Sequence, residues 1–504
     1  MDIVPLFGLL GRGVLPILRL KPFTLSLSLS ALAGDTLLPG DLLVKEHVVS
    51  VPVDHGAGPS GRFGSLEVFV REIVPASKST DADMPCLMYL QGGPGFPSGR
   101  PSAPPSGWMK AALGKGYRVF LLDQRGTGRS SPVTAQSLAT MSSPADQAEY
   151  LTHFRADSIV RDCEVVREKV CKARKLTLLG QSFGGFCILS YLSLYPQSIE
   201  RALLTFGLAP VGRSADEVYA KTYKRMEERN RRFYERYPDD VELVRSIVRS
   251  LHEAPQPLPR GGTLTPRRFL QLGLLLGSAS GFESLHNLLE LARTPPPLTA
   301  PGAVPSTKAS AAAPKDPLRF SAHFLLAVEE AQQQFETNPL FWILHESIYC
   351  DGGAHVDGAR GPSCWAAERI LATQGAAWDC TTRLTPGAPP VLLTGEHVFS
   401  WMADDYAWLR PLKPAAELLA AKADWGPLYD RVVLGQREGP PVAALVSYED
   451  IYVERAFSEE TAAMLGGRAR LWITNEFQHS GLRDDPSVFE RLLAMSKGEV
   501  AIPS

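Results

Sequence analysis

The stretch that most constrains the fold is residues 176–185, Leu-Thr-Leu-Leu-Gly-Gln-Ser-Phe-Gly-Gly, where an apolar run leads into a Gly-x-Ser-x-Gly turn. A serine on a tight turn between a strand and a helix needs glycines on both sides, and Gly180 and Gly184 supply them. Apolar residues at helical spacing then continue to Pro196. The stretch therefore predicts a nucleophile elbow that exposes Ser182, rather than a structural glycine turn.

Segments on both sides of the elbow predict an α/β fold. Alternating apolar runs open the chain and are typical of paired antiparallel strands. Continuous apolar runs follow, as expected for strands that are buried on both faces, and residues 155–170 have a helical period. This order indicates a mostly parallel, doubly wound sheet. The expected strands are residues 47–53, 66–74, 86–90, 117–123, the run from 176 that leads into the turn at Gly180, 201–207, 442–446 and 469–474.

An acid and a histidine follow the last two expected strands. Catalytic side chains of open α/β sheets gather at the carboxyl ends of strands, and an α/β-hydrolase carries its triad in the chain order Ser, Asp, His. Ser182, Asp450 and His479 meet this order and are the predicted triad. Glu449 is a rival acid, but neighbours in an extended chain point to opposite faces, so only one of the two can face His479.

Five short motifs support a more specific prediction. They are Gln-Gly-Gly-Pro-Gly at 91–95, Asp-Gln-Arg-Gly-Thr-Gly-Arg-Ser at 123–130, Gly-Gln-Ser-Phe-Gly-Gly at 180–185, Tyr-Glu-Asp-Ile-Tyr-Val at 448–453 and Asn-Glu-Phe-Gln-His-Ser-Gly-Leu-Arg at 475–483. With these motifs the chain resembles the longer branch of the proline iminopeptidase (prolyl aminopeptidase) family of the α/β-hydrolase superfamily. The resemblance runs from about residue 45 to the end. Its main departure is Gln91, where shorter members carry His.

The resemblance implies a serine aminopeptidase that releases an N-terminal residue, preferentially proline, through an acyl-enzyme. The substrate would be a peptide or aminoacyl compound with a free N-terminus. His479 would take the proton of Ser182, and Asp450 would orient the imidazole. The backbone N–H groups of Phe183, which follows the nucleophile, and of Gly93 are expected to form the oxyanion hole.

An aminopeptidase must also bind an ammonium group, which requires a carboxylate in a partly dry pocket. In the resembling family, glutamates of the helical cap do this, one of them in a Glu-x-x-Tyr context. Glu346 in Glu-Ser-Ile-Tyr matches that context and is the first candidate, and Glu396 is the second. Glu283 and Glu368 are weaker candidates, because a glutamate on an amphipathic helix is usually a solvated surface residue.

The predicted organisation is an α/β-hydrolase core interrupted by a helical cap. The first core segment covers residues 41–212, the cap insertion 213–385 and the second core segment 386–504. Within the insertion, residues 293–317 are rich in Pro, Ala, Ser and Thr and are predicted to be disordered. Residues 1–40 carry scattered basic residues and a Ser-Leu run, which fits either an organelle transit segment or a disordered start.

Composition gives no sign of several classes of partner. The 52 Lys and Arg nearly balance the 54 Asp and Glu, so nothing indicates a nucleic-acid partner. No run of 18 uncharged apolar residues exists, so no membrane span is expected. The seven scattered cysteines lack metal-ligand spacing and are predicted to be reduced thiols. We therefore expect a cytoplasmic protein, or one of plastids or mitochondria if residues 1–40 are a transit segment, and the sequence leaves the oligomeric state open.

Two other functions remain compatible with the same residues. A related serine esterase or amidase would keep the triad but lack the ammonium site. A non-catalytic scaffold is possible because one fold hosts many functions, although the intact Ser, Asp and His favour an enzyme. Epoxide hydrolases and dehalogenases place Asp at the elbow, where this chain has Ser182. Because no metal cluster or dinucleotide fingerprint is present, neither a metal nor another cofactor is predicted.

Overall fold

The structure is a computed structural model that describes residues 34–292, 318–352 and 361–501. The Pro- and Ala-rich loop predicted at 293–317 lies outside the described residues, as does most of the N-terminal extension predicted at 1–40. Within the described parts of the chain, no helix combines the length and the apolar character needed to span a bilayer. The seven cysteines are all described, and each is a free thiol.

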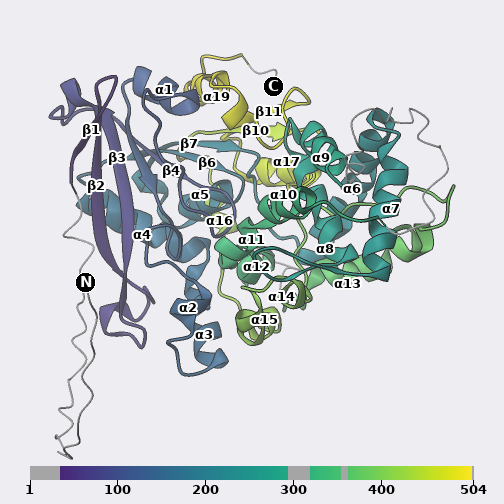
Figure 1. Ribbon diagram of the computed structural model, residues 1–504. Coiled ribbons are helices and arrows are strands. Elements are labelled where there is room, and N and C mark those ends of the chain that lie inside the picture. Colours follow the sequence, from purple (N-terminus) through teal and green to yellow (C-terminus); the bar gives the residue numbers. More distant parts are fainter. Residues whose placement is uncertain (1–33, 293–317, 353–360, 502–504) are drawn as a thin grey trace, which may run out of the picture.

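A nine-stranded sheet forms the core of the molecule and in Figure 1 runs from β1–β3 at the left edge to β10 and β11 near the middle. Its strands in spatial order are β1 (Thr36–Leu38), β2 (Leu42–Pro52), β3 (Ser65–Pro75), β5 (Arg118–Leu122), β4 (Cys86–Leu90), β6 (Leu176–Gln181), β7 (Ile199–Thr205), β10 (Val442–Ser447) and β11 (Ala469–Thr474). The pairs from β1 to β5 are antiparallel, and all pairs from β5 to β11 are parallel. The predicted mostly parallel α/β-hydrolase sheet is therefore confirmed.

Helices cover both faces of this sheet and bury its strands. Leu178 of β6 belongs to the large core shared with α4 and α5, whereas its neighbour Leu179 packs into a second core with α1 and α19. A strand covered on both faces needs apolar residues at successive positions, which is the continuous pattern seen in the sequence. The helices of this part are α1 (Gly107–Gly114), α2 (Ala135–Leu138), α3 (Pro144–Leu151), α4 (Ala156–Lys169), α5 (Phe183–Leu194), α16 (Arg431–Leu434), α17 (Arg455–Met464), α18 (Gly481–Asp484) and α19 (Ser487–Lys497).

Between β7 and β10 the chain forms a helical insertion, which we call the cap. Figure 1 shows the cap gathered on one side of the sheet. Its first helix begins at a capping box, in which Ser214 and Glu217 bond each other's backbone N–H. The cap comprises α6 (Ala215–Arg236), α7 (Asp240–Glu253), α8 (Pro266–Leu270), α9 (Gly281–Glu290), α10 (Ala322–Gln332), α11 (Gln334–Thr337), α12 (Pro339–Leu344), α13 (Ala366–Thr373), α14 (Met402–Asp405) and α15 (Lys413–Ala420), with a short hairpin of β8 (Gln256–Pro257) and β9 (Thr263–Leu264).

Residues 391–399 connect these helices without forming a helix or strand of their own. The amide side chain of Asn230 in α6 bonds both the N–H and the carbonyl of Leu393 at 2.9 Å. The Thr394 N–H donates to the carbonyl of Leu270 in α8 at 2.9 Å. The sheet resumes only at β10, and the division of the chain at 385/386 remains a prediction.

Candidate active site

Ser182 lies on the turn between β6 and α5. Its backbone conformation is one that residues other than glycine rarely adopt. Its φ is 54° and its ψ is −126°. Glycines surround it because there is no room for a side chain. A Cβ added at Gly184 would lie 2.0 Å from the carbonyl oxygen of Leu90, and one added at Gly207 would lie 2.3 Å from the carbonyl oxygen of Ser182. This geometry is that of the strained strand-to-helix turn that the sequence predicts.

The loop after β4 lies directly against this turn. A Cβ added at Gly92 would be 3.7 Å from the Ser182 hydroxyl oxygen. Gly93 has a φ of 134°, a conformation that needs glycine. Phe183 begins α5, so its N–H is one of the first in the helix, which have no partner within the helix. The structure thus brings the loop of Gly93 and the start of α5 to the serine, and their role as an oxyanion hole remains a prediction.

His479 and Asp450 contact each other at the carboxyl ends of β11 and β10. The Nδ1 of His479 lies 2.8 Å from one carboxylate oxygen of Asp450. The other oxygen accepts the backbone N–H groups of Tyr452 and Val453 at 2.8 and 3.0 Å. Both side chains are buried. A carboxylate held in this way keeps the proton of the imidazole on Nδ1 and leaves Nε2 able to accept a proton.

Further contacts fix the position of His479. Its ring packs edge-on against the ring of Tyr452, with the ring centroids 4.7 Å apart, and lies tilted against the ring of Phe206 at a centroid distance of 5.5 Å. The side-chain amide of Gln181 donates to the carbonyl of His479 at 3.1 Å. Because Gln181 precedes Ser182 in the chain, this bond ties the elbow to the histidine loop.

The rival acid Glu449 has a different partner. Its carboxylate forms an ion pair with Arg232 of cap helix α6. The two adjacent acids therefore have different partners: Glu449 pairs with Arg232, and Asp450 contacts His479.

Glu346 is a buried carboxylate at the start of the 3₁₀ turn η7 (Glu346–Tyr349). Its two oxygens accept the N–H groups of Ala366 and Ala367 at 3.0 and 2.9 Å, where α13 begins. These bonds to the helix N-terminus favour its charged form, but burial has the larger effect and raises the pKa of Glu346 to about 7.

Glu396 lies close enough to Asp450 for the two charges to interact. Burial raises the pKa of Glu396 well above its usual range, and the negative charge of Asp450 adds to the effect. The side chain keeps 16% of its surface exposed. Within the described residues its carboxylate has no hydrogen bond, and the basic side chain that approaches it is His345, whose Nε2 is 4.0 Å from a Glu396 oxygen. A buried carboxylate with so little compensation is suited to receive a cation.

Comparison with known proteins agrees with this geometry. Residues 85–244 match the family model for the alpha/beta hydrolase fold. The chain is 44% identical to the proline iminopeptidase of Aeromonas sobria over 453 residues, which is 90% of this chain and 96% of that protein. The chain belongs to the proline iminopeptidase family. It is also 32% identical to proline iminopeptidase aneH of Aspergillus aculeatus, covering 92% of this chain and 95% of that one. Among solved structures, esterase E22 has a TM-score of 0.41 and 14% identity, covering 89% of this chain and 100% of that one.

The two weaker glutamate candidates of this family member have structural partners. Glu283 forms an ion pair with Arg236 of α6. One oxygen of Glu368 accepts the N–H and the hydroxyl of Ser400 at 3.0 and 2.8 Å. Both carboxylates therefore already have partners, whereas the carboxylate of Glu396 has no hydrogen bond among the described residues.

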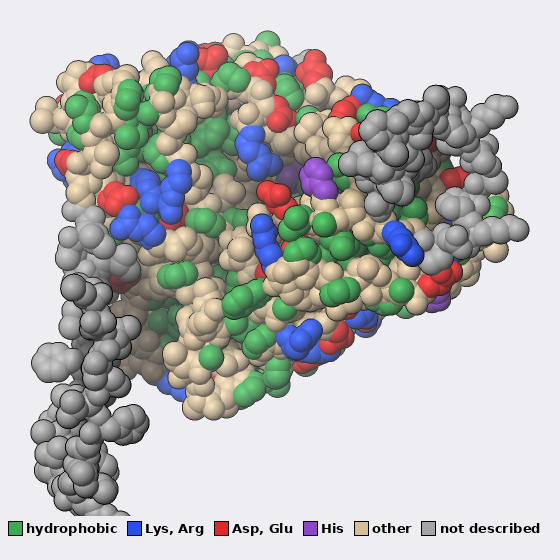
Figure 2. Space-filling model, in the orientation of Figure 1, with side chains coloured by type: hydrophobic (Ala, Val, Ile, Leu, Met, Phe, Trp, Pro, Cys, Tyr) green, Lys and Arg blue, Asp and Glu red, His purple; other side chains and the backbone are tan. Residues whose placement is uncertain are grey.

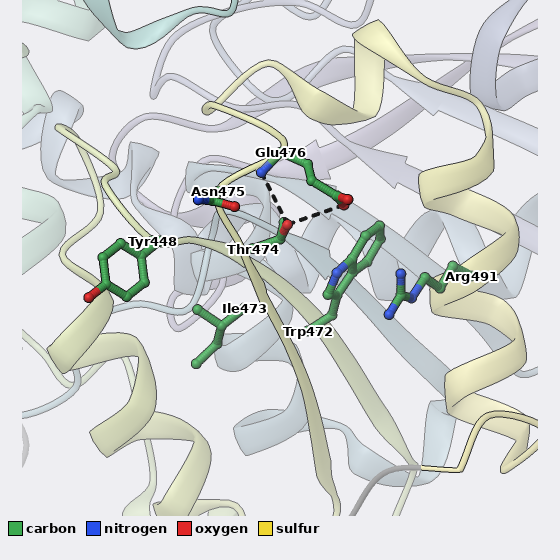
Figure 3. Close-up of a pocket in the computed structure, with 7 residues that line it drawn as sticks. All are labelled: Tyr448, Trp472, Ile473, Thr474, Asn475, Glu476 and Arg491. Atoms are coloured by element: carbon green, nitrogen blue, oxygen red, sulfur yellow. Dashed lines mark hydrogen bonds between the residues drawn. The ribbon is translucent and has the colours of Figure 1, made fainter.

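Among the other concave surfaces, the pocket beside β11 contains none of the predicted site residues, whereas a small cavity in the cap is lined by Glu346. Figure 2 shows a hollow between the sheet and the cap, with a histidine at its edge and charged side chains around it. Figure 3 shows a separate open pocket beside β11, where the guanidinium of Arg491 lies 3.9 Å over the ring of Trp472. No three His, Cys, Asp or Glu side chains of the described residues gather as a metal site.

Sequence reasoning missed the residues that orient His479. Gln181 and Tyr452 lie inside the motifs that carry the family resemblance, but a motif does not say which member contacts which. Phe206 follows β7 and carries no motif, so only the fold reveals its contact with the imidazole.

Proposed function

We propose that the protein is a serine aminopeptidase that releases an N-terminal residue, preferentially proline, from peptides. The observation that carries the proposal is the largely buried carboxylate of Glu396, which has no hydrogen bond among the described residues and interacts with the charge of Asp450, the partner of His479. A hydrolase for simple esters has no use for such a group, whereas an aminopeptidase needs it to bind the substrate ammonium. Membership of the proline iminopeptidase family supports proline as the preferred residue.

In the proposed mechanism, Ser182 attacks the scissile carbonyl as its proton passes to Nε2 of His479. Asp450 orients the imidazole and stabilises its charged form, and the N–H groups of Gly93 and Phe183 receive the oxyanion. His479 then returns the proton to the leaving amine, which yields the acyl-enzyme and a shortened peptide. A water molecule, deprotonated by His479, hydrolyses the ester and releases the amino acid.

The substrate ammonium binds in the cap between the two buried carboxylates, Glu346 and Glu396. Because both oxygens of Glu346 already accept backbone N–H groups, Glu396 makes the direct contact and Glu346 adds negative potential behind it. The negative charges of both residues act on Tyr219 and Tyr349 and raise the pKa of each phenol beyond the effect of burial. The ammonium compensates the desolvation of the carboxylates, so a charged amine is favoured over a neutral group.

Three chromogenic substrates test the proposal: prolyl 4-nitroanilide, its N-acetyl derivative and the 4-nitrophenyl ester of a simple carboxylic acid. We expect rapid cleavage of the free prolyl substrate and none of the acetylated one, because acetylation removes the charge and adds bulk. Equal cleavage of the two anilides would replace the proposal with an amidase. Cleavage of the ester alone would indicate an esterase, and no cleavage of any would indicate a scaffold.

We also propose a cytoplasmic location, in which the free thiols stay reduced. The alternative, a plastid or mitochondrion, depends on residues 1–40, most of which lie outside the described part of the chain. Cell fractionation with an antibody against the cap separates the two.

A further inference from the structure

His345 stands out in the cap because its ring is buried without hydrogen bonds. The side chain has no exposed surface, and within the described residues neither Nδ1 nor Nε2 has a partner. Buried polar atoms in native proteins are nearly always paired, so two unpaired nitrogens on one ring require an explanation. A second unpaired atom of the same region is the hydroxyl of Tyr219, which is also buried.

A neighbouring histidine shows the ordinary arrangement. His397 is equally buried, but its Nδ1 accepts the N–H of Gly395 at 3.0 Å and its Nε2 lies 3.1 Å from the hydroxyl of Thr222. Both nitrogens of His397 are thus used to hold the loop that carries Glu396. His345 makes no such hydrogen bonds, so it does not hold this loop in the way that His397 does.

The carboxylate of Glu396 lies near His345. The Nε2 of His345 lies 4.0 Å from a Glu396 oxygen, about one ångström beyond hydrogen-bond distance. Burial lowers the pKa of His345 to about 3, so the ring is neutral at working pH and carries one N–H donor. Contacts between reacting or binding groups are often long in the free enzyme and shorten when the substrate binds.

We propose that His345 is a positioning residue that donates its Nε2–H to the Glu396 carboxylate when the substrate ammonium binds there. This inference rests on the proposed function. A neutral donor suits the task because it stabilises the charged form of Glu396 without neutralising it. A lysine or arginine in its place would occupy the carboxylate and compete with the substrate ammonium.

Packing holds the His345 ring in place without hydrogen bonds. The centroid of its ring lies 4.8 Å from that of the Phe341 ring and 6.2 Å from that of the Tyr349 ring. Phe341 in turn contacts Phe96, in the loop after β4, at 5.5 Å. The same cap segment therefore touches the loop beside Ser182 and carries the histidine, so an apolar residue of similar size at 345 preserves the packing and removes only the N–H donor.

Two substitutions and a control test this inference. His345→Leu removes the donor, His345→Gln keeps an N–H at the position of Nε2, and His286→Leu is a matched control in cap helix α9, where His286 pairs with Asp240. The substrates are prolyl 4-nitroanilide and the 4-nitrophenyl ester of cyclopentanecarboxylic acid, which has the same ring size but no amine. The measured quantity is the ratio of their kcat/KM values, with kcat and KM for the prolyl substrate determined separately.

We expect His345→Leu to lower this ratio by about tenfold or more, through KM, because a hydrogen bond to a charged group is lost. His345→Gln restores most of the ratio, and His286→Leu leaves it unchanged. If His345→Leu does not fold, His345→Phe takes its place with the same expected loss. An unchanged ratio in the Leu or Phe variant, or a Gln variant as impaired as Leu, overturns the inference. A wild-type enzyme that does not cleave the prolyl substrate overturns the proposed function instead.

Discussion

Arg232 of cap helix α6 forms an ion pair with Glu449, the residue that precedes Asp450 in the chain. The contact joins the cap to the loop after β10, at the point where Asp450 meets His479. The cap therefore holds Glu449, the adjacent rival acid, in an ion pair, and Asp450 is the acid that contacts His479.

The two adjacent acids should respond very differently to substitution. Asp450→Asn is expected to lower kcat on a prolyl anilide by about 10⁴-fold, by analogy with the equivalent change in a serine protease, because the imidazole then adopts the wrong tautomer. Glu449→Gln breaks only the ion pair with Arg232 and should cost less than about tenfold, since a partly exposed ion pair contributes little. If the two variants rank in the opposite order, Glu449 is the catalytic acid.

Glu396→Gln should impair binding of the free amine. Truncating one partner of a buried charge pair leaves the other unpaired, which corresponds to a loss of about 30-fold to several thousand-fold in kcat/KM. Glu368→Gln is the matched control, because Glu368 bonds Ser400 and is expected to have a small effect. Steady-state kinetics on prolyl 4-nitroanilide distinguish them, and an equal loss in both variants would remove Glu396 from the amine site.

Glu346 should make the stability of the protein depend on pH. Burial raises its pKa from the ordinary value of 4.5 to about 7, so the folded protein binds this proton more tightly than the unfolded chain. The resulting stabilisation is complete below pH about 4.5 and is lost as the pH rises through about 7, by about 3 kcal/mol in all. Glu346→Gln cannot titrate, so the free energy of unfolding of the wild type, measured relative to this variant in urea, should fall by that amount between pH 4.5 and 8. A difference that stays constant with pH would contradict the raised pKa.

Gly184→Ala should destabilise the elbow. The added Cβ would lie 2.0 Å from the carbonyl oxygen of Leu90, a backbone atom that cannot move independently. We expect a loss of about 3 kcal/mol, at the upper end for overpacking, and loss of activity with it. Gly99→Ala is the control, because nothing lies within 4 Å of its added Cβ. Thermal unfolding of the two variants provides the comparison, and a Gly184→Ala variant as stable as wild type would contradict the described packing.

The parts of the fold that the sequence predicted well are those where local pattern and burial agree. The strand at Cys86–Leu90 is apolar at each position because both faces are covered, and the predicted limits match the structure. The elbow was equally clear, since only glycine satisfies the close approach of Gly184 to Leu90. Local pattern was sufficient in both places.

The sequence alone does not show which glutamate is free to bind the substrate ammonium, because the hydrogen-bond partners of these glutamates are distant in the chain. Glu346 bonds the start of a helix 20 residues away, and Glu368 bonds Ser400, 32 residues away. The sequence places Glu346 before Glu396 because of its Glu-x-x-Tyr motif, and a motif does not reveal that the Glu346 carboxylate already accepts two backbone N–H groups. His345 showed no signal at all, since a buried histidine is recognised as unpaired only when its surroundings are known.

The central claim is that Ser182 is the nucleophile of an aminopeptidase, and labelling with a fluorophosphonate tests it most directly. The reagent should add covalently to the peptide that contains Ser182, as measured by mass spectrometry, and excess prolyl substrate should slow the reaction. The Ser182→Ala variant should fold normally, take up no label and lose its turnover of prolyl 4-nitroanilide, apart from the residual catalysis of binding and the oxyanion hole. Unlabelled wild-type enzyme, or a Ser182→Ala variant that still cleaves the prolyl substrate at the wild-type rate, would contradict the claim.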